Sequence, residues 1–338
     1  MGRKGPGDYA RSWTPPVYEV DDDERIVGVV NERTPNNWGR WGAEDERGTT
    51  NLLTPERVRA GARLIRSGRT VSMAVPLNSR GPVHPSRPGI QHWYGYSGAD
   101  MITGSRVSKA YAVWQGSDDY ISMPLQGSTQ WDGLAHVGHE DSLYNGYWLG
   151  CVDSFSGARR CSIHRQRDRL CGRGVLLDVA RCKGVDRLAQ GYAITPADLD
   201  EAMAAAGTEV ASGDILIIRT GHVAWWYSGE ADRDAFFADG EPGLGVACVE
   251  WLAAKDVAAV ALDNIGVEVE PFESDAAQPL EVHSRLIRDL GMTLGEILDF
   301  EELSADCAAD GVYEFFVAAP PIKFAKAVGS PINPLAIK

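Results

Sequence analysis

The sequence lacks the features that identify several classes of protein. No run of about eighteen apolar residues occurs, which excludes a transmembrane helix. No cluster of Lys and Arg stands out against a net charge of −14, so nucleic acids and anionic membranes are poor partners. Walker and Gly-x-Ser-x-Gly motifs are missing too, which argues against a nucleotide-binding P-loop and an α/β-hydrolase nucleophile.

Cysteine usage provides no metal or disulfide framework. The six cysteines form no Cys-x-x-Cys pair, and the spacings of about ten residues between the first four match no zinc module. The opening sequence is polar and has no apolar stretch typical of a secretory signal. We therefore expect reduced thiols and a cytoplasmic location.

The composition is that of a globular protein: 338 residues, of which 44% are hydrophobic and 24% are charged. This length permits two domains, but one large α/β domain is equally compatible. Residues 1–36 are rich in Pro and Gly and contain the acidic run DDDE. We expect them to form an extended or disordered N-terminal arm without a core of its own.

Strand and helix patterns alternate after residue 170. Apolar runs at 174–181 and 214–221 predict buried strands. Residues 195–207 predict a helix between these strands, since the segment opens on Thr-Pro and ends on Gly. Residues 279–292 predict a second strong helix that Gly291 stops. This alternation predicts an α/β fold.

Polar side chains gather in the string STQWDGLAH. If this segment is extended, Gln130 and Asp132 point the same way, because side chains alternate along a strand. Oxygens from Gln and Asp and a nitrogen from His136 would suit Mn²⁺, Zn²⁺ or Fe²⁺. Spacing alone favours the alternative, in which Asp132 caps a helix and His136 satisfies a buried carbonyl group.

His283 and Glu296 are further candidates for metal ligands. The first lies on the predicted helix 279–292 and the second lies just past its end. A metal site needs ligands from distant parts of the chain, and these are the obvious donors. On their own they equally fit a histidine on a helix surface and a glutamate that caps the next helix.

Other sites are poorer candidates. A Ser or Thr nucleophile paired with His136 would leave the adjacent Gln and Asp unexplained. The segment GLGVAC lacks the third glycine of a dinucleotide-binding loop. His222 follows the predicted strand 214–221, at the kind of position where α/β proteins often place site residues, but a single histidine is weak evidence.

The string QGSTQWDGLAH resembles the H-x-G-T-H-x-D-x-P-x-H motif of the cyclase-like metal-dependent hydrolase family, which includes arylformamidase and isatin hydrolase. Three motif positions are unchanged: Thr129, Asp132 and His136. Four differ: Gln126 and Gln130 replace the first two histidines, Ser128 replaces glycine and Leu134 replaces proline. The sequence is most similar to larger members that carry T-Q-W-D-x-L-A-H followed by Y-N-G, and the resemblance continues to the C-terminus.

This resemblance implies a fold and an assembly. The expected fold is a swivelling β/β/α domain with a mixed sheet flanked by helices. It would form a single domain over residues 37–338. Family members are dimers or tetramers with active sites near subunit contacts, so a homodimer or homotetramer is expected.

The resemblance also implies a metal site. By motif position, the ligands would be Gln126, Gln130 and Asp132, completed by His283 and Glu296. The last histidine of the motif, His136, would be the proton shuttle. Amide oxygens are weaker donors than imidazole, which favours one divalent ion, Mn²⁺ or Zn²⁺, with Mn²⁺ plausible as the harder of the two.

The implied function is hydrolysis of an amide, formamide, lactam or lactone bond in a small cyclic or aromatic molecule by metal-activated water. Trp131, His139 and Tyr94 would line the substrate pocket, with core packing as the alternative role for these side chains. Two alternatives stay open: a cyclase or dehydratase of secondary metabolism that uses the same metal site, and a non-catalytic binder of small molecules. Metal analysis separates the binder from both enzymes.

Overall fold

A nine-stranded mixed sheet organises the chain. The computed structural model describes residues 17–104, 115–231, 233–274 and 279–338. In spatial order the strands of the sheet are β1 (Thr70–Ser72), β15 (Leu335–Ile337), β13 (Glu314–Ala318), β7 (Cys171–Asp178), β9 (Ile215–Arg219), β11 (Ala259–Leu262), β12 (Thr293–Glu296), β4 (Gln130–Asp132) and β14 (Gly329–Pro331). The predicted α/β fold, with a mixed sheet flanked by helices, is confirmed.

The four strands β7, β9, β11 and β12 run parallel, and β4 joins them antiparallel. Strand β9 is buried at every residue, as its uninterrupted apolar sequence predicts for a parallel strand covered on both faces. Parallel strands end at the same edge of a sheet, so the carboxyl ends of these four strands lie together. Sites in α/β proteins form at this edge.

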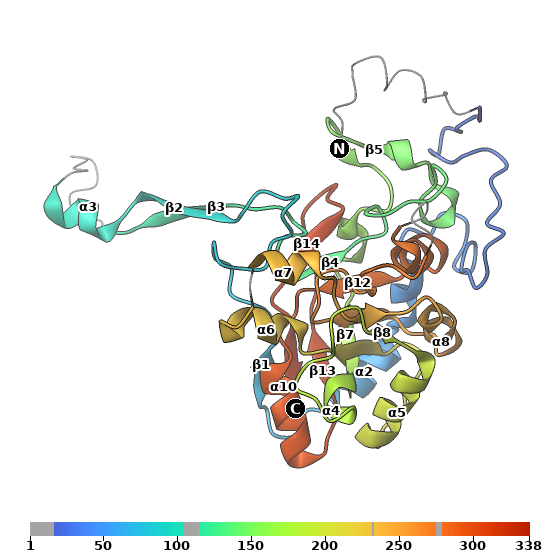
Figure 1. The fold of residues 1–338 in the computed structure, drawn as a ribbon. Coiled ribbons are helices and arrows are strands. Elements are labelled where there is room, and N and C mark those ends of the chain that lie inside the picture. Colours follow the sequence, from blue (N-terminus) through green and yellow to red (C-terminus); the bar gives the residue numbers. More distant parts are fainter. Residues whose placement is uncertain (1–16, 105–114, 232, 275–278) are drawn as a thin grey trace.

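Helices cover both faces of the sheet (Figure 1). They are α2 (Pro55–Ala62), α4 (Val179–Cys182), α5 (Pro196–Ala206), α6 (His222–Ser228), α7 (Arg233–Ala238), α8 (Cys248–Ala254), α9 (Glu281–His283) and α10 (Glu301–Asp310). One core cluster contains Leu216 of β9 with side chains of α5 and α8, whereas Ile217, the next residue, packs with side chains of α10. Among the described residues no helix is long and apolar enough to cross a membrane.

The predicted helix 195–207 is confirmed as α5. Thr195 and Asp198 form a reciprocal capping box, and Gly207 ends the helix with a φ of 62°. The predicted helix 279–292 is α9 followed by the π-helical turn η6 (Ser284–Asp289). After Gly291, at φ 67°, the chain enters β12, so Glu296 lies in a strand and caps no helix.

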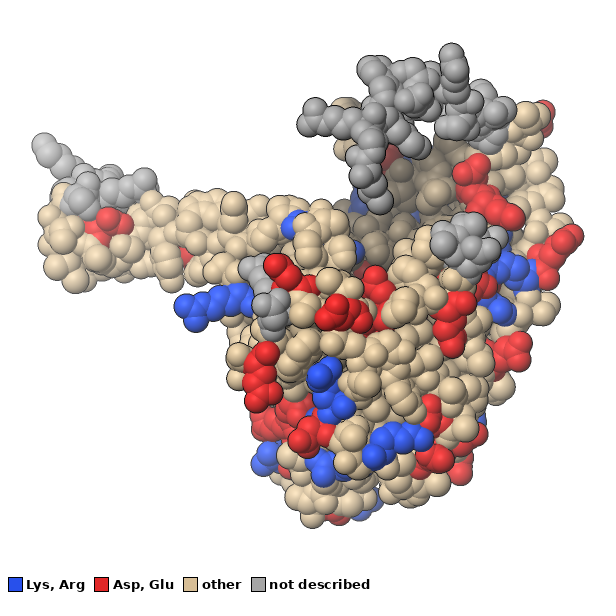
Figure 2. Space-filling view, viewed as in Figure 1, with Lys and Arg blue, Asp and Glu red and all other residues tan. Residues whose placement is uncertain are grey.

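A hairpin arm projects from the body of the molecule (Figure 1). It consists of β2 (Gln91–Tyr96) and β3 (Asp118–Ser122), with α3 (Gly98–Thr103) near its tip. Trp93 and Tyr120 stack across the two strands with ring centroids 5.8 Å apart. Both rings are about half exposed, as are Tyr94 and Ile121. The face of the arm that Figure 2 shows carries few charged side chains.

The described part of the N-terminal segment follows the body as a series of turns, one of which is closed by the pairing of Val20 with Ile26. Arg33 donates to Glu281 over 2.6 Å and lies 3.2 Å from Asp289, so the segment is bound to α9 and η6. Residues 1–16 of the predicted arm lie outside the described residues. The division into an arm of residues 1–36 and a domain of residues 37–338 stays a prediction.

Gly295 allows β12 to approach its neighbours closely. A Cβ atom at this position would lie 2.6 Å from the Cβ of Ala261 on β11 and 2.6 Å from the ring of Trp131 on β4. Both contacts are too short for a side chain. The next residue is Glu296, so this close approach also determines where that carboxylate lies.

We expect Gly295→Ala to lower the free energy of unfolding by about 1–3 kcal/mol, because β12 must move away from Trp131 and Ala261. Chemical denaturation measures this. Gly89→Ala is the matched control, since a Cβ there meets no atom within 4 Å; its effect should stay within about 0.5 kcal/mol. Equal stability of the two variants would contradict the close approach.

Candidate metal centre

The pairing of β4 with β12 brings two distant segments together. In this antiparallel pair Gln130 lies opposite Glu296 and Asp132 lies opposite Leu294. His283 approaches from α9. Ligand atoms of Asp132, His283 and Glu296 all lie within 4.8 Å of one another, and the three residues are buried. The positions near 130 and near 290 that the resemblance implied are therefore adjacent in the fold.

Hydrogen bonds orient these side chains. The amide of Gln130 donates to Glu296 Oε2 over 2.5 Å, and His283 Nε2 lies 3.1 Å from Glu296 Oε1. The other ring nitrogen of His283, Nδ1, lies 2.5 Å from Glu268 Oε1. Glu268 also accepts the backbone N–H groups of Val282 and His283. A carboxylate on Nδ1 turns Nε2 toward the centre, as in carboxylate–histidine–metal arrangements.

Several buried acceptor atoms have no donor. Both carboxylate oxygens of Asp132 and Oε1 of Gln130 are buried without a hydrogen-bond partner among the described residues. An unpaired buried carboxylate is unfavourable, since it has left water without gaining a partner. Burial and then the nearby Glu296 carboxylate raise the pKa of Asp132 well above its usual range.

These unsatisfied oxygens fit a cation. Two carboxylates, one imidazole and one amide oxygen form a donor set that suits a divalent ion such as Mn²⁺ or Zn²⁺. Gln126 lies beside these ligands, because its side chain and that of Asp132 both contact Gly329. A Cβ atom built on Gly329 would lie 2.4 Å from Gln126 Nε2 and 3.3 Å from Asp132 Oδ1. The residues present therefore match the group that the resemblance implied.

The two histidines of the centre differ in protonation. Burial lowers the pKa of His283, but hydrogen bonds to Glu268 and Glu296 outweigh burial and raise that pKa to about 10. An ion that binds Nε2 must therefore displace a proton. His136 Nε2 lies 3.6 Å from Asp132 Oδ2, and burial lowers the pKa of His136 to about 4. An imidazole with that pKa is neutral near pH 7 and can accept a proton.

The structure does not bring all the predicted pocket residues to this centre. Trp131 points to the other face of β4, where it is 1% exposed and donates its indole N–H to the carbonyl of Ala319. Tyr94 lies on the projecting arm and is 58% exposed. His139 lies in the turn after His136, with its ring 3.9 Å from Glu140.

Three residues around the centre escaped the sequence analysis: Arg87, Glu241 and Glu268. Arg87 donates to the backbone carbonyl of Gln126 over 2.8 Å. Glu241 is buried, accepts the N–H of Ile265 over 2.7 Å, and lies 3.7 Å from His222 Nε2. None of the three belongs to a motif with a metal-ligand spacing, so no signal along the chain would have found them.

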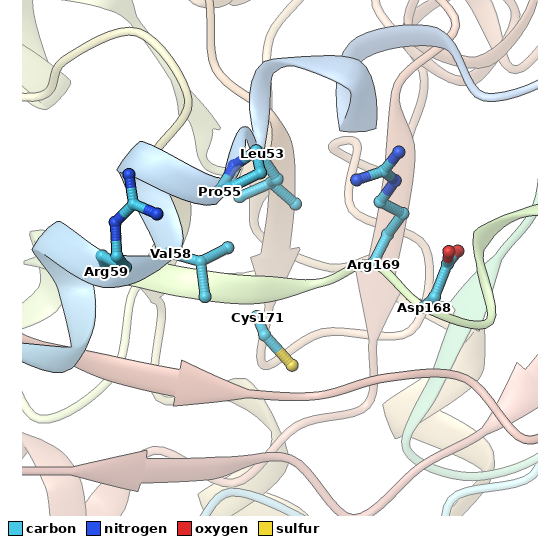
Figure 3. Close-up of a pocket in the computed structure, with 7 residues that line it drawn as sticks. All are labelled: Leu53, Pro55, Val58, Arg59, Asp168, Arg169 and Cys171. Carbon is cyan, nitrogen blue, oxygen red and sulfur yellow. The ribbon is translucent and has the colours of Figure 1, made fainter.

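A separate surface pocket lies between α2 and the start of β7 (Figure 3). It has a volume of about 360 Å³ and is lined by side chains that include Arg59, Arg169 and Cys171. Cys171 is the first residue of β7, whereas Glu296 is the last residue of the parallel strand β12. The pocket therefore lies at the opposite edge of the sheet from the candidate centre.

Comparisons with known proteins agree with this fold. The family described as "Putative cyclase" matches residues 71–269. The crystal structure of a novel cyclase superposes with a TM-score of 0.85 at 46% identity, over 90% of this chain and 97% of that chain. Isatin hydrolase A from Labrenzia aggregata, bound to benzyl benzoate, has a TM-score of 0.56 at 16% identity, over 79% of this chain and 93% of its own.

An isatin hydrolase bound to the product analogue thioisatinate gives a TM-score of 0.56 at 17% identity, over 84% of this chain and 98% of that chain. At these identities the isatin hydrolases show the shared fold alone. None of the curated proteins matches the chain.

We expect Asp132→Asn to stabilise the ion-free protein by about 1–2 kcal/mol near pH 7 and to abolish binding of Mn²⁺. The amide removes an unpaired buried charge. Since the folded-state pKa of Asp132 is raised, this gain should shrink as the pH falls toward about 4, where the unfolded-state carboxyl also gains its proton. Denaturation with a chelator measures stability, and calorimetry measures Mn²⁺ binding.

Asp263→Asn is the matched control. Asp263 is also buried, but its carboxylate accepts three hydrogen bonds from Thr220 and Gly221. This variant should lose about 1–3 kcal/mol of stability and keep its affinity for Mn²⁺. Wild-type affinity for Mn²⁺ in Asp132→Asn would remove Asp132 from the ligand set.

Proposed function

The chain belongs to the cyclase family, and from this premise we propose that it is a metal-dependent hydrolase. It opens an amide, formamide, lactam or lactone bond of a small cyclic or aromatic substrate. The observation that carries this proposal is the buried group of Asp132, His283 and Glu296. Within the described chain neither oxygen of Asp132 accepts a well-formed hydrogen bond, although the Gln126 amide lies close by and His136 Nε2 lies 3.6 Å from Oδ2. Acceptors buried without donors are rare in proteins, and a bound ion accounts for these.

Side chains of four different types would hold the ion. Asp132 and Glu296 supply carboxylate oxygens and His283 supplies Nε2, while Gln130 and Gln126 supply amide oxygens. The set is richer in oxygen than one with histidines at the two glutamine positions, which favours Mn²⁺ over Zn²⁺. When bound, the ion would lower the pKa of a water molecule toward neutrality and polarise the substrate carbonyl.

His136 would move the protons of the reaction. Its Nε2 lies 3.6 Å from Asp132, and its side chain is 22% exposed, so the ring lies between the buried ligands and the outside. From this position the neutral ring takes a proton from the attacking water at Nε2. It then gives the proton to the leaving nitrogen or oxygen atom, as a general base and acid in turn.

An aromatic cluster of α6 and α7 lies near the centre. His222 stacks on Phe236 of α7 with ring centroids 4.3 Å apart, and Trp226 of α6 packs edge-on against Phe236 at 4.8 Å. His222 Nε2 lies 3.7 Å from Glu241. Glu241 and His283 both lie next to Gly266, which connects His222 to the centre. His222 and Phe236 are themselves buried, at 0% and 1% exposed, so within this cluster only the partly exposed rings of Trp225 and Trp226 can contact a ligand. His139 stays a predicted pocket residue.

Protein loaded with Mn²⁺ should hydrolyse at least one of N-formylkynurenine, isatin and small lactams. Asp132→Ala should lower kcat/KM by about 100-fold or more through loss of the ion. His136→Ala should lower kcat by about 100- to 10,000-fold while Mn²⁺ still binds.

The matched control is His92→Ala, since His92 also lies beside a carboxylate, that of Asp119, but on the arm. Its activity should equal that of the wild type. Hydrolysis that survives Asp132→Ala would contradict the metal-dependent mechanism.

We also propose that the arm mediates assembly into a homodimer or homotetramer. Trp93, Tyr94, Tyr120 and Ile121 are each about half exposed on it. A hairpin of two strands is only marginally stable in isolation, and clustered exposed apolar side chains are typical of interaction surfaces. A second copy of the chain would bury them.

Sedimentation velocity should therefore show an oligomer for the wild type and a smaller species for the double variant Trp93→Ser, Tyr120→Ser. Phe155→Ser serves as the control, because Phe155 is 99% exposed but lies outside the arm. A wild type that sediments as a monomer would contradict the proposal.

A further inference from the structure

Arg87 lies beside the candidate centre without being one of its ligands. It is half-buried in the loop between β1 and β2. Its Nη1 donates to the backbone carbonyl of Gln126 over 2.8 Å. The side chain of Gln126 in turn lies against Gly329 next to Asp132. Gln126 therefore lies between the guanidinium group of Arg87 and the carboxylate of Asp132.

The charge of Arg87 acts on the centre. It lies close enough to lower the pKa of both Asp132 and His136, although burial has the largest effect on each. No carboxylate among the described residues forms an ion pair with Arg87. By contrast, Arg33 and Arg173, which are also half-buried, lie within 2.6 Å of Glu281 and Asp214. Arg87 thus presents a positive charge at the site without a partner in the described chain.

The geometry of the guanidinium group determines which ligand it suits. With Nη1 on the Gln126 carbonyl, Nε and Nη2 make no hydrogen bond to a described residue. These two donors form one flat edge of the group, and this edge matches a carboxylate bidentately. Chloride or a neutral carbonyl would use at most part of it.

We propose that Arg87 is the anion-binding residue of this site and holds a carboxylate of the bound small molecule through Nε and Nη2. This inference rests on the proposed function, because it identifies the group that the substrate or product presents beside the reacting bond. The carboxylate has two sources: a substituent that the substrate already carries, or the carboxylate that ring opening forms. In either case Arg87 selects its ligand by charge.

Binding of two probes tests the proposal. Benzoate and benzamide have nearly the same shape, and only benzoate is charged. Calorimetry with the full chain, both ion-free and loaded with Mn²⁺, should show benzoate bound about 10- to 100-fold more tightly than benzamide. Arg87→Met should remove this preference, and Arg87→Lys, which keeps the charge but not the flat edge, should restore only part of it.

Arg80→Met is the matched control. Arg80 lies in the same loop and is exposed, and its carbonyl accepts from Trp226 while no described residue binds its side chain. This variant should keep the preference for benzoate. If the role of Arg87 were purely structural, Arg87→Met would weaken the binding of benzoate and benzamide alike. Loss of benzoate binding alone is therefore the distinguishing result. Equal affinity of the wild type for the two probes, or an unchanged preference in Arg87→Met, would overturn the proposal.

Hydrolysis of 2-formamidobenzoate and formanilide shows whether the carboxylate bound by Arg87 belongs to the substrate or to the product. If Arg87 holds a carboxylate of the substrate, the charged formamide should react with a kcat/KM about 10- to 100-fold higher, and Arg87→Met should remove the difference. If it holds only the product, the two formamides should react alike while benzoate binding still depends on Arg87. A protein that binds benzoate through Arg87 but hydrolyses nothing would refute the proposed function and leave this inference intact.

Discussion

The antiparallel pairing of β4 with β12 is the constraint on which the candidate centre depends. It sets Gln130 opposite Glu296 and buries both strands in the sheet. Gly295 permits the approach, since the ring of Trp131 occupies the space where a side chain at this position would lie. A strand contact made for packing therefore also delivers an amide and two carboxylates to one point.

That point is electrostatically unfavourable without an ion. Asp132 and Glu296 are buried side by side, and Glu268 and Glu241 lie in the same neighbourhood. His283 compensates part of this negative charge through hydrogen bonds to two of the carboxylates. Folding has to overcome the remaining repulsion, which is the usual consequence of building a site for a charged ligand into a protein interior.

Arg87 and His136 lie at the margin of the buried group of ligands. His136 is partly exposed beside Asp132, and Arg87 holds the backbone of Gln126. A neutral base and a cation that no described carboxylate pairs with flank the acidic centre. Under our proposals they act on a ligand that arrives as an anion and reacts by proton transfer. His222 connects the aromatic cluster of α6 and α7 to Glu241.

The helix 195–207, the buried strand near 215 and the family motif with Asp132 and His136 could be predicted from the sequence, because periodicity, caps and motif spacing are local properties of the chain. Residue type and position made Gln130, His283 and Glu296 candidate ligands, and the resemblance assigned them to one metal site. Three facts could be read only from the folded chain: Trp131 is a core residue, Tyr94 lies on a projecting arm, and Glu268 and Arg87 flank the centre. Strand pairing joins Gln130 to Glu296 across 166 positions, and no local pattern encodes such a contact.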